Sequence, residues 1–97
     1  MSIIIVAELS IKPGRMDDLK TFMAEIISDT RSFDGCKQID ICTNPEDENS
    51  IVLVEKWDSK EHYEKYHHWR SETGDLGKFR ELFAGPPKRQ FLDITDI

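Results

Sequence analysis

Apolar and polar residues alternate with different periods along the chain, and the first two periods predict a strand and a helix. Residues 3–11 begin as an unbroken apolar run and then alternate until Pro13 and Gly14, a pattern typical of a strand that ends in a turn. Over residues 15–31 apolar side chains recur every three or four positions. Two aspartates occupy the start of this stretch, where the helix dipole favours negative charge, so a helix follows the strand.

The middle of the chain predicts a β-hairpin. Asp34-Gly35 interrupts the helical period, and residues 36–43 then alternate isoleucines with polar side chains. A polar loop over residues 44–50 leads into residues 51–57, which are dense in β-branched side chains. We therefore expect two further strands joined by this loop.

The last part of the chain predicts two helices and a final strand. Asp58 is placed as an N-cap, and Glu61 three residues later completes a capping box for a helix over residues 59–72. Gly74 is a natural stop for that helix. The remaining segments are a shorter helix over residues 76–83 and, after Gly85-Pro86-Pro87, a strand over residues 88–94.

The resulting order is β-α-β-β-α-β, the split pattern of a ferredoxin-like fold. An α+β domain of this kind has an antiparallel sheet with its helices on one face. No internal repeat, low-complexity segment or linker divides the chain, so we expect residues 1–97 to form a single domain.

The two strands richest in aliphatic residues, around IIIV and IVLV, are apolar on both faces. Two helices cover only one face of a sheet, so the other face needs a cover. A second copy of the chain is the economical solution, with two sheets facing each other across a two-fold axis. We therefore expect an obligate homodimer whose interface uses one alternate set of these residues, among them Ile4, Val6, Val52 and Val54.

Charge and composition exclude several classes of partner and environment. Thirteen basic against nineteen acidic residues give a net charge of −6, which disfavours binding to nucleic acid or to an anionic membrane. The opening apolar run spans only five residues, too short for a membrane span or the core of a signal peptide. Cys36 and Cys42 would lie roughly 20 Å apart on one strand, beyond disulfide reach. Free thiols are typical of a reducing compartment, so we expect a cytoplasmic protein.

Candidate chemistry concentrates in one segment. The chain has no glycine-rich phosphate loop, no CxxC pair, no HExxH and no nucleophile elbow, so we expect no cofactor and no metal. Residues 57–70, WDSKEHYEKYHHWR, hold two Trp, two Tyr, three His and one Arg. This density of aromatic and ionisable rings makes the segment the best functional candidate.

Several of these residues have more than one interpretation. Glu64 with His67 or His68 has the spacing of a metal pair on a helix, but a third ligand is needed and adjacent histidines point about 100° apart, so solvated histidines are the simpler account. Tyr63, Tyr66 and Trp69 form either an aromatic seam against the sheet or the wall of a pocket. The partner of Arg70 is either an acid in the dimer or an anionic oxygen of a substrate.

The chain resembles the antibiotic biosynthesis monooxygenase family. The resemblance rests on Glu55-Lys56-Trp57, on the capped segment WDSKEHYEKY, on the helix end WRSETG and on the double proline before the last strand. It implies a dimeric α+β barrel built from two ferredoxin-like subunits. Members of this superfamily oxygenate quinols and anthrone-like arenes without a cofactor, degrade haem, isomerise small sugars, or only bind ligands.

Two departures from the family's patterns narrow these possibilities. Many members have a histidine nine residues after the strand tryptophan, where this chain has Tyr66 followed by His67. The haem-degrading branch uses an asparagine, a tryptophan and a histidine at positions that align with Ala7, Tyr66 and Leu76 here. The resemblance therefore disfavours haem degradation.

The function that the resemblance implies is cofactor-independent oxygenation of a small quinol or anthrone-like arene by dioxygen, in a pocket between helices and sheet. His67 is the expected base, His62 the reserve, and Tyr66 or Arg70 would hold the developing oxyanion. The expected pocket walls are Ala7, Trp57, Tyr63, Tyr66, Trp69, Phe79 and Phe83. The alternatives are an isomerase or lyase of a small polar metabolite, favoured by a polar lining, and a binding or dimerisation module with a closed seam. A cavity beside the second helix that contains His67 or Tyr66 is the observation that discriminates best.

Overall fold

The elements follow one another in the order that the sequence predicts. A computed structural model describes residues 2–97. Its elements are β1 (Ile3–Ser10), α1 (Met16–Ser32), β2 (Cys36–Asn44), β3 (Asp47–Trp57), α2 (Lys60–Thr73), α3 (Asp75–Leu82) and β4 (Lys88–Asp93). The predicted ferredoxin-like α+β fold is confirmed.

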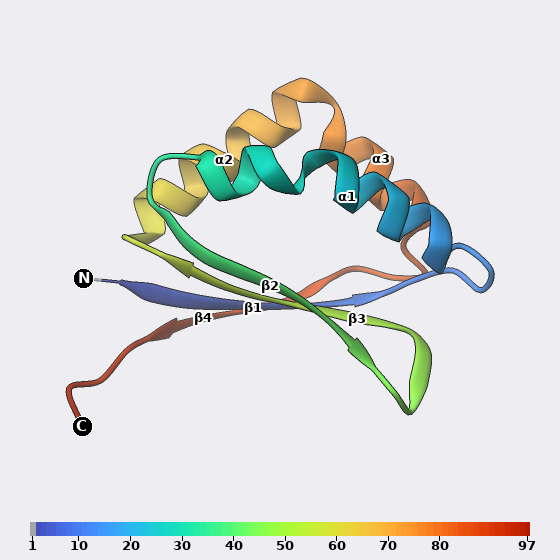
Figure 1. The fold of residues 1–97 in the computed structure, drawn as a ribbon, viewed down its shortest axis with the longest axis horizontal. Coiled ribbons are helices and arrows are strands. Elements are labelled where there is room, and N and C mark those ends of the chain that lie inside the picture. Colours follow the sequence, from blue (N-terminus) through green and yellow to red (C-terminus); the bar gives the residue numbers. More distant parts are fainter. Residues whose placement is uncertain (1) are drawn as a thin grey trace.

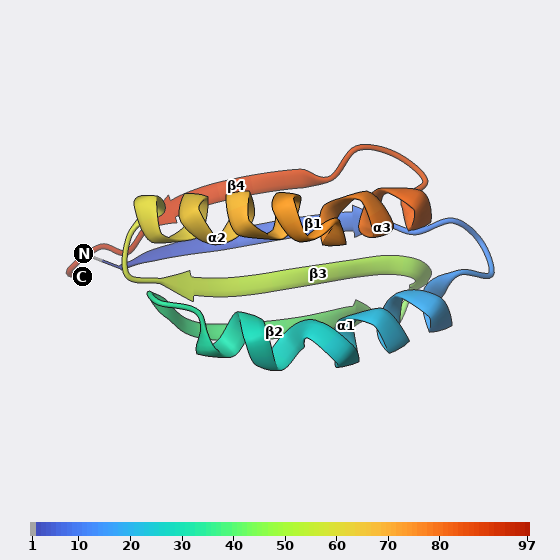
Figure 2. The same cartoon turned by 90° about the horizontal axis from the view of Figure 1, so that it is seen from above.

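The sheet has the strand order β2-β3-β1-β4, and every pair of neighbours is antiparallel. The two aliphatic strands, β1 and β3, occupy its centre, where β-branched side chains pack best. All three helices lie on one face of the sheet (Figure 1). Seen from above, α1 runs along the β2 side while α2 and α3 run along the β1 and β4 side (Figure 2).

The two faces of the central strands have different surroundings. Odd-numbered residues of β1, such as Ile5 and Leu9, are buried beneath the helices. Even-numbered residues lie on the other face, which no helix covers and which we call the open face. Its central residues are Ile4 and Val6 of β1, opposite Lys56 and Val54 of β3, with Val52 nearby. The four residues named for the expected dimer interface, Ile4, Val6, Val52 and Val54, thus all lie on the open face.

The buried residues form two clusters, one at each end of the helical layer. The first contains Leu9, Ile11, Leu19, Met23, Ile51 and Leu82. The second contains Ile3, Ile5, Trp57 and Tyr63. The space between the clusters is where a pocket forms.

The β2–β3 hairpin is tighter than predicted. The polar loop expected over residues 44–50 is reduced to a two-residue turn at Pro45 and Glu46, and β3 begins at Asp47. The Asn44 side chain accepts a hydrogen bond from the Glu46 amide at 2.9 Å, which closes the turn locally. The polar residues after it continue the strand because they pair with neighbouring strands.

The start of α2 also differs from the prediction. Ser59, not Asp58, is the N-cap, and its hydroxyl accepts a hydrogen bond from the His62 amide at 3.2 Å. The His62 ring lies against the same hydroxyl, with Nδ1 at 2.6 Å from Oγ. The pair that caps the helix is therefore Ser59 and His62, shifted one residue from Asp58 and Glu61. The predicted stop at Gly74 is confirmed by its left-handed backbone, φ 85°.

Two smaller features bear on the environment of the protein. Cys36 and Cys42, at opposite ends of β2, are free thiols. Within residues 2–97, no helix combines the length and the apolar character that a membrane crossing requires.

Candidate functional site

A cavity of about 270 Å³ lies between the helices and the covered face of the sheet. We call it the central cavity. Its buried lining residues come from the sheet and from α1 and α2, while Arg80 of α3 and Arg89 of β4 are its exposed lining residues. Its apolar lining residues are Ala7, Leu9, Met23, Ile26, Ile27, Ile39, Leu53, Leu76, Phe79, Phe83 and Pro87. Apolar walls of this kind exclude water and strengthen any polar interaction inside.

Helix α2 directs four side chains at the central cavity. Tyr63, Tyr66, His67 and Arg70 follow one another at helical spacing, so they lie on one face of the helix, and all four line the cavity. Burial raises the pKa of Tyr63 to about 12, with Arg89 acting in the opposite direction. Burial also raises the pKa of Tyr66, against the effect of its hydrogen bonds with Thr30 and Arg70. Both phenols therefore stay protonated at neutral pH.

His67 is half-buried and next to two arginines. Its Nε2 lies 3.4 Å from a terminal nitrogen of Arg89 on β4. Since a guanidinium only donates, Nε2 accepts this contact and the neutral ring carries its proton on Nδ1. Burial, then Arg89 and Arg80, lower the pKa of His67 below its ordinary value of 6.5. The imidazole is therefore neutral at pH 7 and able to accept a proton.

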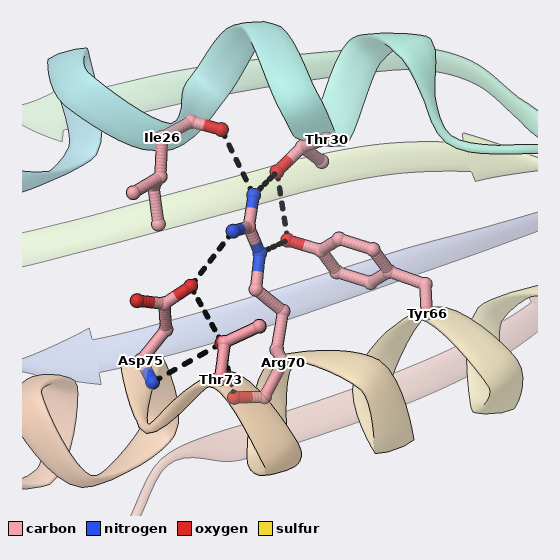
Figure 3. A network of polar contacts seen from close by, with 6 residues as sticks. All are labelled: Ile26, Thr30, Tyr66, Arg70, Thr73 and Asp75. Carbon is pink, nitrogen blue, oxygen red and sulfur yellow. Dashed lines mark hydrogen bonds and ion pairs between the residues drawn. The ribbon is translucent and has the colours of Figure 1, made fainter.

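Arg70 holds the helices together from inside the layer. Only 2% of its surface is exposed, and four of its five N–H donors are used (Figure 3). They reach the Tyr66 hydroxyl at 3.0 Å, the Asp75 carboxylate at 2.8 Å, the Ile26 carbonyl at 2.8 Å and the Thr30 hydroxyl at 2.9 Å. We call this the Arg70 network.

The Arg70 network answers the question of the arginine's partner. Of the two expected kinds of partner, the structure shows an acid, Asp75 of the same chain. Tyr66 is also engaged, because its hydroxyl shares a 2.7 Å hydrogen bond with Thr30. The two residues expected to hold an oxyanion thus use most of their donors inside the protein.

Glu55 is a lining residue that the sequence analysis did not single out as a site residue. Only 4% of its surface is exposed, and its Oε1 accepts a hydrogen bond from Trp57 Nε1 at 3.0 Å. Burial raises the pKa of this carboxyl, opposed by the Trp57 hydrogen bond and by Arg89. A signal was present in the sequence, because Glu55 alternates with Leu53 and Trp57 and therefore shares their inward face.

Three of the expected site residues lie away from the central cavity. Trp57 is fully buried in the core, Trp69 packs on Phe33 with ring centroids 5.4 Å apart, and His62 belongs to the cap of α2. None of the three is a lining residue, in contrast to Ala7, Phe79 and Phe83, which are. Trp69 does not line the cavity because it is rotated about 120° around the helix from Tyr63.

The residues considered for a metal are dispersed. Within residues 2–97, no three histidine, cysteine or acidic side chains come together in a way that could hold an ion. His68 pairs instead with Glu72, one turn further along α2, at 2.6 Å. His67 and Glu55 both line the central cavity, where burial shifts the pKa of each toward its neutral form.

Relatives of this chain share its architecture at low sequence identity. The Bacillus subtilis (strain 168) protein named "Putative monooxygenase YcnE" is 23% identical over 84 residues, 87% of this chain and 88% of that relative. A conserved protein from Methanosarcina mazei Go1 has a TM-score of 0.89 at 14% identity, covering 98% of this chain and 94% of the other. Rv0793 from Mycobacterium tuberculosis has a TM-score of 0.76 at 21% identity, covering 100% and 98%.

The pairwise comparisons above show a shared fold, and a match to a family model identifies the family. The model described as antibiotic biosynthesis monooxygenase matches residues 2–73, from the first strand to the end of α2. That match includes both central strands and the helix that carries His67. The chain therefore belongs to the antibiotic biosynthesis monooxygenase family.

Proposed function

We propose that this protein is a cofactor-independent monooxygenase that oxidises a small quinol or anthrone-like arene with dioxygen in the central cavity. The observation that carries the proposal is an apolar cavity whose lining includes a neutral, half-buried histidine. A dry cavity favours charge that is spread over a ring system, and a neutral imidazole is a competent proton acceptor.

The chemistry needs no electron source beyond the substrate. Once Arg89 turns away from Nε2, His67 takes a proton on this nitrogen from the reacting carbon or hydroxyl, and the electron pair stays on the arene. The carbanion form of an anthrone then bonds to one atom of dioxygen, and the resulting peroxide takes the proton back from His67. Loss of the second C–H proton and cleavage of the O–O bond leave a carbonyl and one water. All four electrons that dioxygen gains come from the arene.

The proposal includes a homodimer built on the open face of the sheet. That face carries half-buried aliphatic residues at its centre and no helix covers it. A second copy would bury this surface and complete a barrel of two sheets. The central cavity lies on the opposite face, so each subunit would keep its own site.

An isomerase acting on a small polar metabolite is the second candidate. Glu55, His67, Arg80 and Arg89 all line the central cavity, and proton shuttling between two carbons needs such groups. The predominantly apolar walls favour the arene instead. A non-catalytic module with a closed seam fits less well, because α2 borders an accessible cavity.

Oxygen consumption discriminates between these functions. The purified protein is mixed with anthrone-type and naphthoquinol substrates without added cofactor, and dioxygen uptake and carbonyl product are followed together. We expect one water and one new carbonyl for each dioxygen consumed from an anthrone. His67→Ala should lower turnover roughly 10²- to 10⁴-fold, the usual contribution of a positioned base.

The matched control is His68→Ala, because His68 lies on the next position of α2 but pairs with the exposed Glu72. We expect its turnover to match the wild type. Uptake that is absent across a broad arene panel would contradict the oxygenase proposal and favour the isomerase. Equal effects of the two histidine variants would contradict the role of His67.

A further inference from the structure

Two arginines of the central cavity have no acidic partner. Arg80 on α3 and Arg89 on β4 both line the cavity and both are exposed. None of the ion pairs found within residues 2–97 includes either of them. We call the part of the cavity near Arg80, Arg89 and His67 its open end.

This arrangement is unusual for so acidic a chain. Acidic residues outnumber basic ones by nineteen to thirteen, so unpaired carboxylates are plentiful elsewhere on the surface. Two arginines that line the cavity without an ion-paired carboxylate leave a positive field beside His67, although Arg89 also acts on the Glu55 carboxyl. A guanidinium pair is well suited to a planar carboxylate, which it binds through parallel hydrogen bonds.

A different polar group, a carboxylate, also lines the cavity. Glu55, on the central strand β3, is covered by the helices, and its Oε1 is used by Trp57. None of the hydrogen bonds found within residues 2–97 reaches its Oε2, and since no fully buried side-chain oxygen there lacks a partner, Oε2 is accessible from the cavity. This oxygen can accept a hydrogen bond from a hydroxyl donor.

The backbones of Glu55 and Arg89 lie two strand spacings apart, roughly 10 Å across the sheet, because β1 separates β3 from β4. Both side chains line the same cavity, and Arg89 acts against the raised pKa of Glu55. No ion pair joins them.

We propose that the arene bound in this cavity is a hydroxy acid, the hydroxyl donating to Glu55 and the carboxylate binding between Arg80 and Arg89. The inference rests on the proposed function in taking the central cavity as the arene site, and it adds the polarity and orientation of the substrate. Binding of the substrate carboxylate would also change the environment of His67. Arg89 now donates to His67 Nε2, so pairing of Arg89 with a carboxylate frees that nitrogen to act as a base.

Calorimetric binding of three related ligands tests the proposal without any turnover. The test ligand is 6-hydroxy-2-naphthoate, which carries both groups at opposite ends of two fused rings. The comparison ligands are 2-naphthoate, which lacks the hydroxyl, and 6-hydroxy-2-naphthamide, which lacks the charge. We expect each comparison ligand to bind about tenfold more weakly, the effect of losing one charge-assisted hydrogen bond.

Variants assign each preference to its residue. Glu55→Gln should bring the test ligand and 2-naphthoate close to equal affinity while leaving the preference for acid over amide. Arg80→Gln and Arg89→Gln should each reduce the preference for acid over amide and leave the preference for the hydroxyl. The matched controls are Glu25→Gln and Arg15→Gln, which remove the same charges from exposed positions of α1 and its N-cap outside the cavity.

The outcomes separate this inference from the oxygenase proposal. Binding selectivity that follows the variants as expected, in a protein that consumes no dioxygen with any arene, supports the inference and contradicts the oxygenase. Oxygen consumption with neutral arenes and no preference for the acid or the hydroxyl overturns the inference alone. Absence of binding by the test ligand at millimolar concentration also overturns it. If Glu55→Gln does not fold, the wild-type ratio between the test ligand and 2-naphthoate decides.

Discussion

Replacing Arg70 with methionine should remove a large part of the stability of the fold. The substitution keeps an unbranched apolar stem but removes the guanidinium that donates to the Asp75 carboxylate, the Thr30 hydroxyl and the Ile26 carbonyl. Asp75 keeps a hydrogen bond from the Thr73 hydroxyl, but its charge loses its cationic partner. Breaking a buried ion pair from one side costs about 3–5 kcal/mol because the remaining charge is uncompensated. Domains of this size have about 5–15 kcal/mol in total. We therefore expect a melting temperature lower by roughly 12–40 °C.

The assay is thermal and urea unfolding by circular dichroism, at one protein concentration so that any association affects all variants equally. Arg15→Met is the matched control, because Arg15 also pairs with an aspartate, Asp18 at 2.7 Å, but both side chains are exposed. An exposed pair contributes at most about 1 kcal/mol. The double variant Arg70→Met/Asp75→Leu should lose less than the sum of its single variants, because no charge is left buried alone.

The reasoning would be refuted by a small effect. If Arg70→Met lowered the free energy of unfolding no more than Arg15→Met does, the hydrogen bonds of the Arg70 network would contribute no more than surface contacts. Strict additivity in the double variant would show that Arg70 and Asp75 do not act as a pair.

Three further predictions test other parts of the structure. Val54→Lys on the open face should convert a dimer into monomers or unfold it, as seen by light scattering, and a folded wild-type particle of 11.3 kDa would contradict the dimer. Burial raises the pKa of Glu55 above 4.5, so wild-type stability should fall as pH rises from about 4.5 through the raised pKa. Glu55→Gln lacks this loss and should gain stability relative to the wild type over the same rise in pH. Parallel stability curves would argue against it. Gly35→Ala should lower the free energy of unfolding by more than about 1 kcal/mol, since φ is +90° and the new Cβ would lie 2.5 Å from the His62 side chain. Gly77→Ala in α3 meets no atom within 4 Å and should raise the free energy of unfolding by about 0.5–1 kcal/mol. Urea midpoints that shift in the same direction for both variants would contradict this contrast.

Local sequence signals were sufficient for most of the fold. The apolar runs of β1 and β3 and the helical period of α1 depend on residues close in sequence, so their patterns identify them directly. The start of β3 does not, because Asp47–Ser50 are polar and belong to the strand only through pairing with β2 and β1. Pairing between distant segments leaves no period in the sequence of either one.

The part of the candidate site that lies on α2 could be predicted from helical geometry. Positions 63, 66, 67 and 70 fall within about 100° of one another around α2, which explains why they share the cavity face while Trp69 does not. The partners of Arg70 could not be predicted, because Thr30 and Ile26 lie about forty residues away in the sequence. Glu55 was predictable in principle from strand alternation, but only the packing of α2 above it shows that it borders a cavity.

The position of the Arg70 network determines how a ligand can reach the interior. A molecule passing between α1 and α2 would have to displace a guanidinium held by four hydrogen bonds, so the Arg70 network blocks this route. The alternative passage is beside the connection from α3 to β4, where Pro86 and Pro87 restrict the backbone and Pro87 borders the cavity. The exposed side chains that line the cavity, Arg80 and Arg89, come from the two elements that this connection joins. Side-chain rotations take picoseconds to nanoseconds, whereas collective helix motions take microseconds or longer, so a ligand of the proposed function should exchange without waiting for the helices to move.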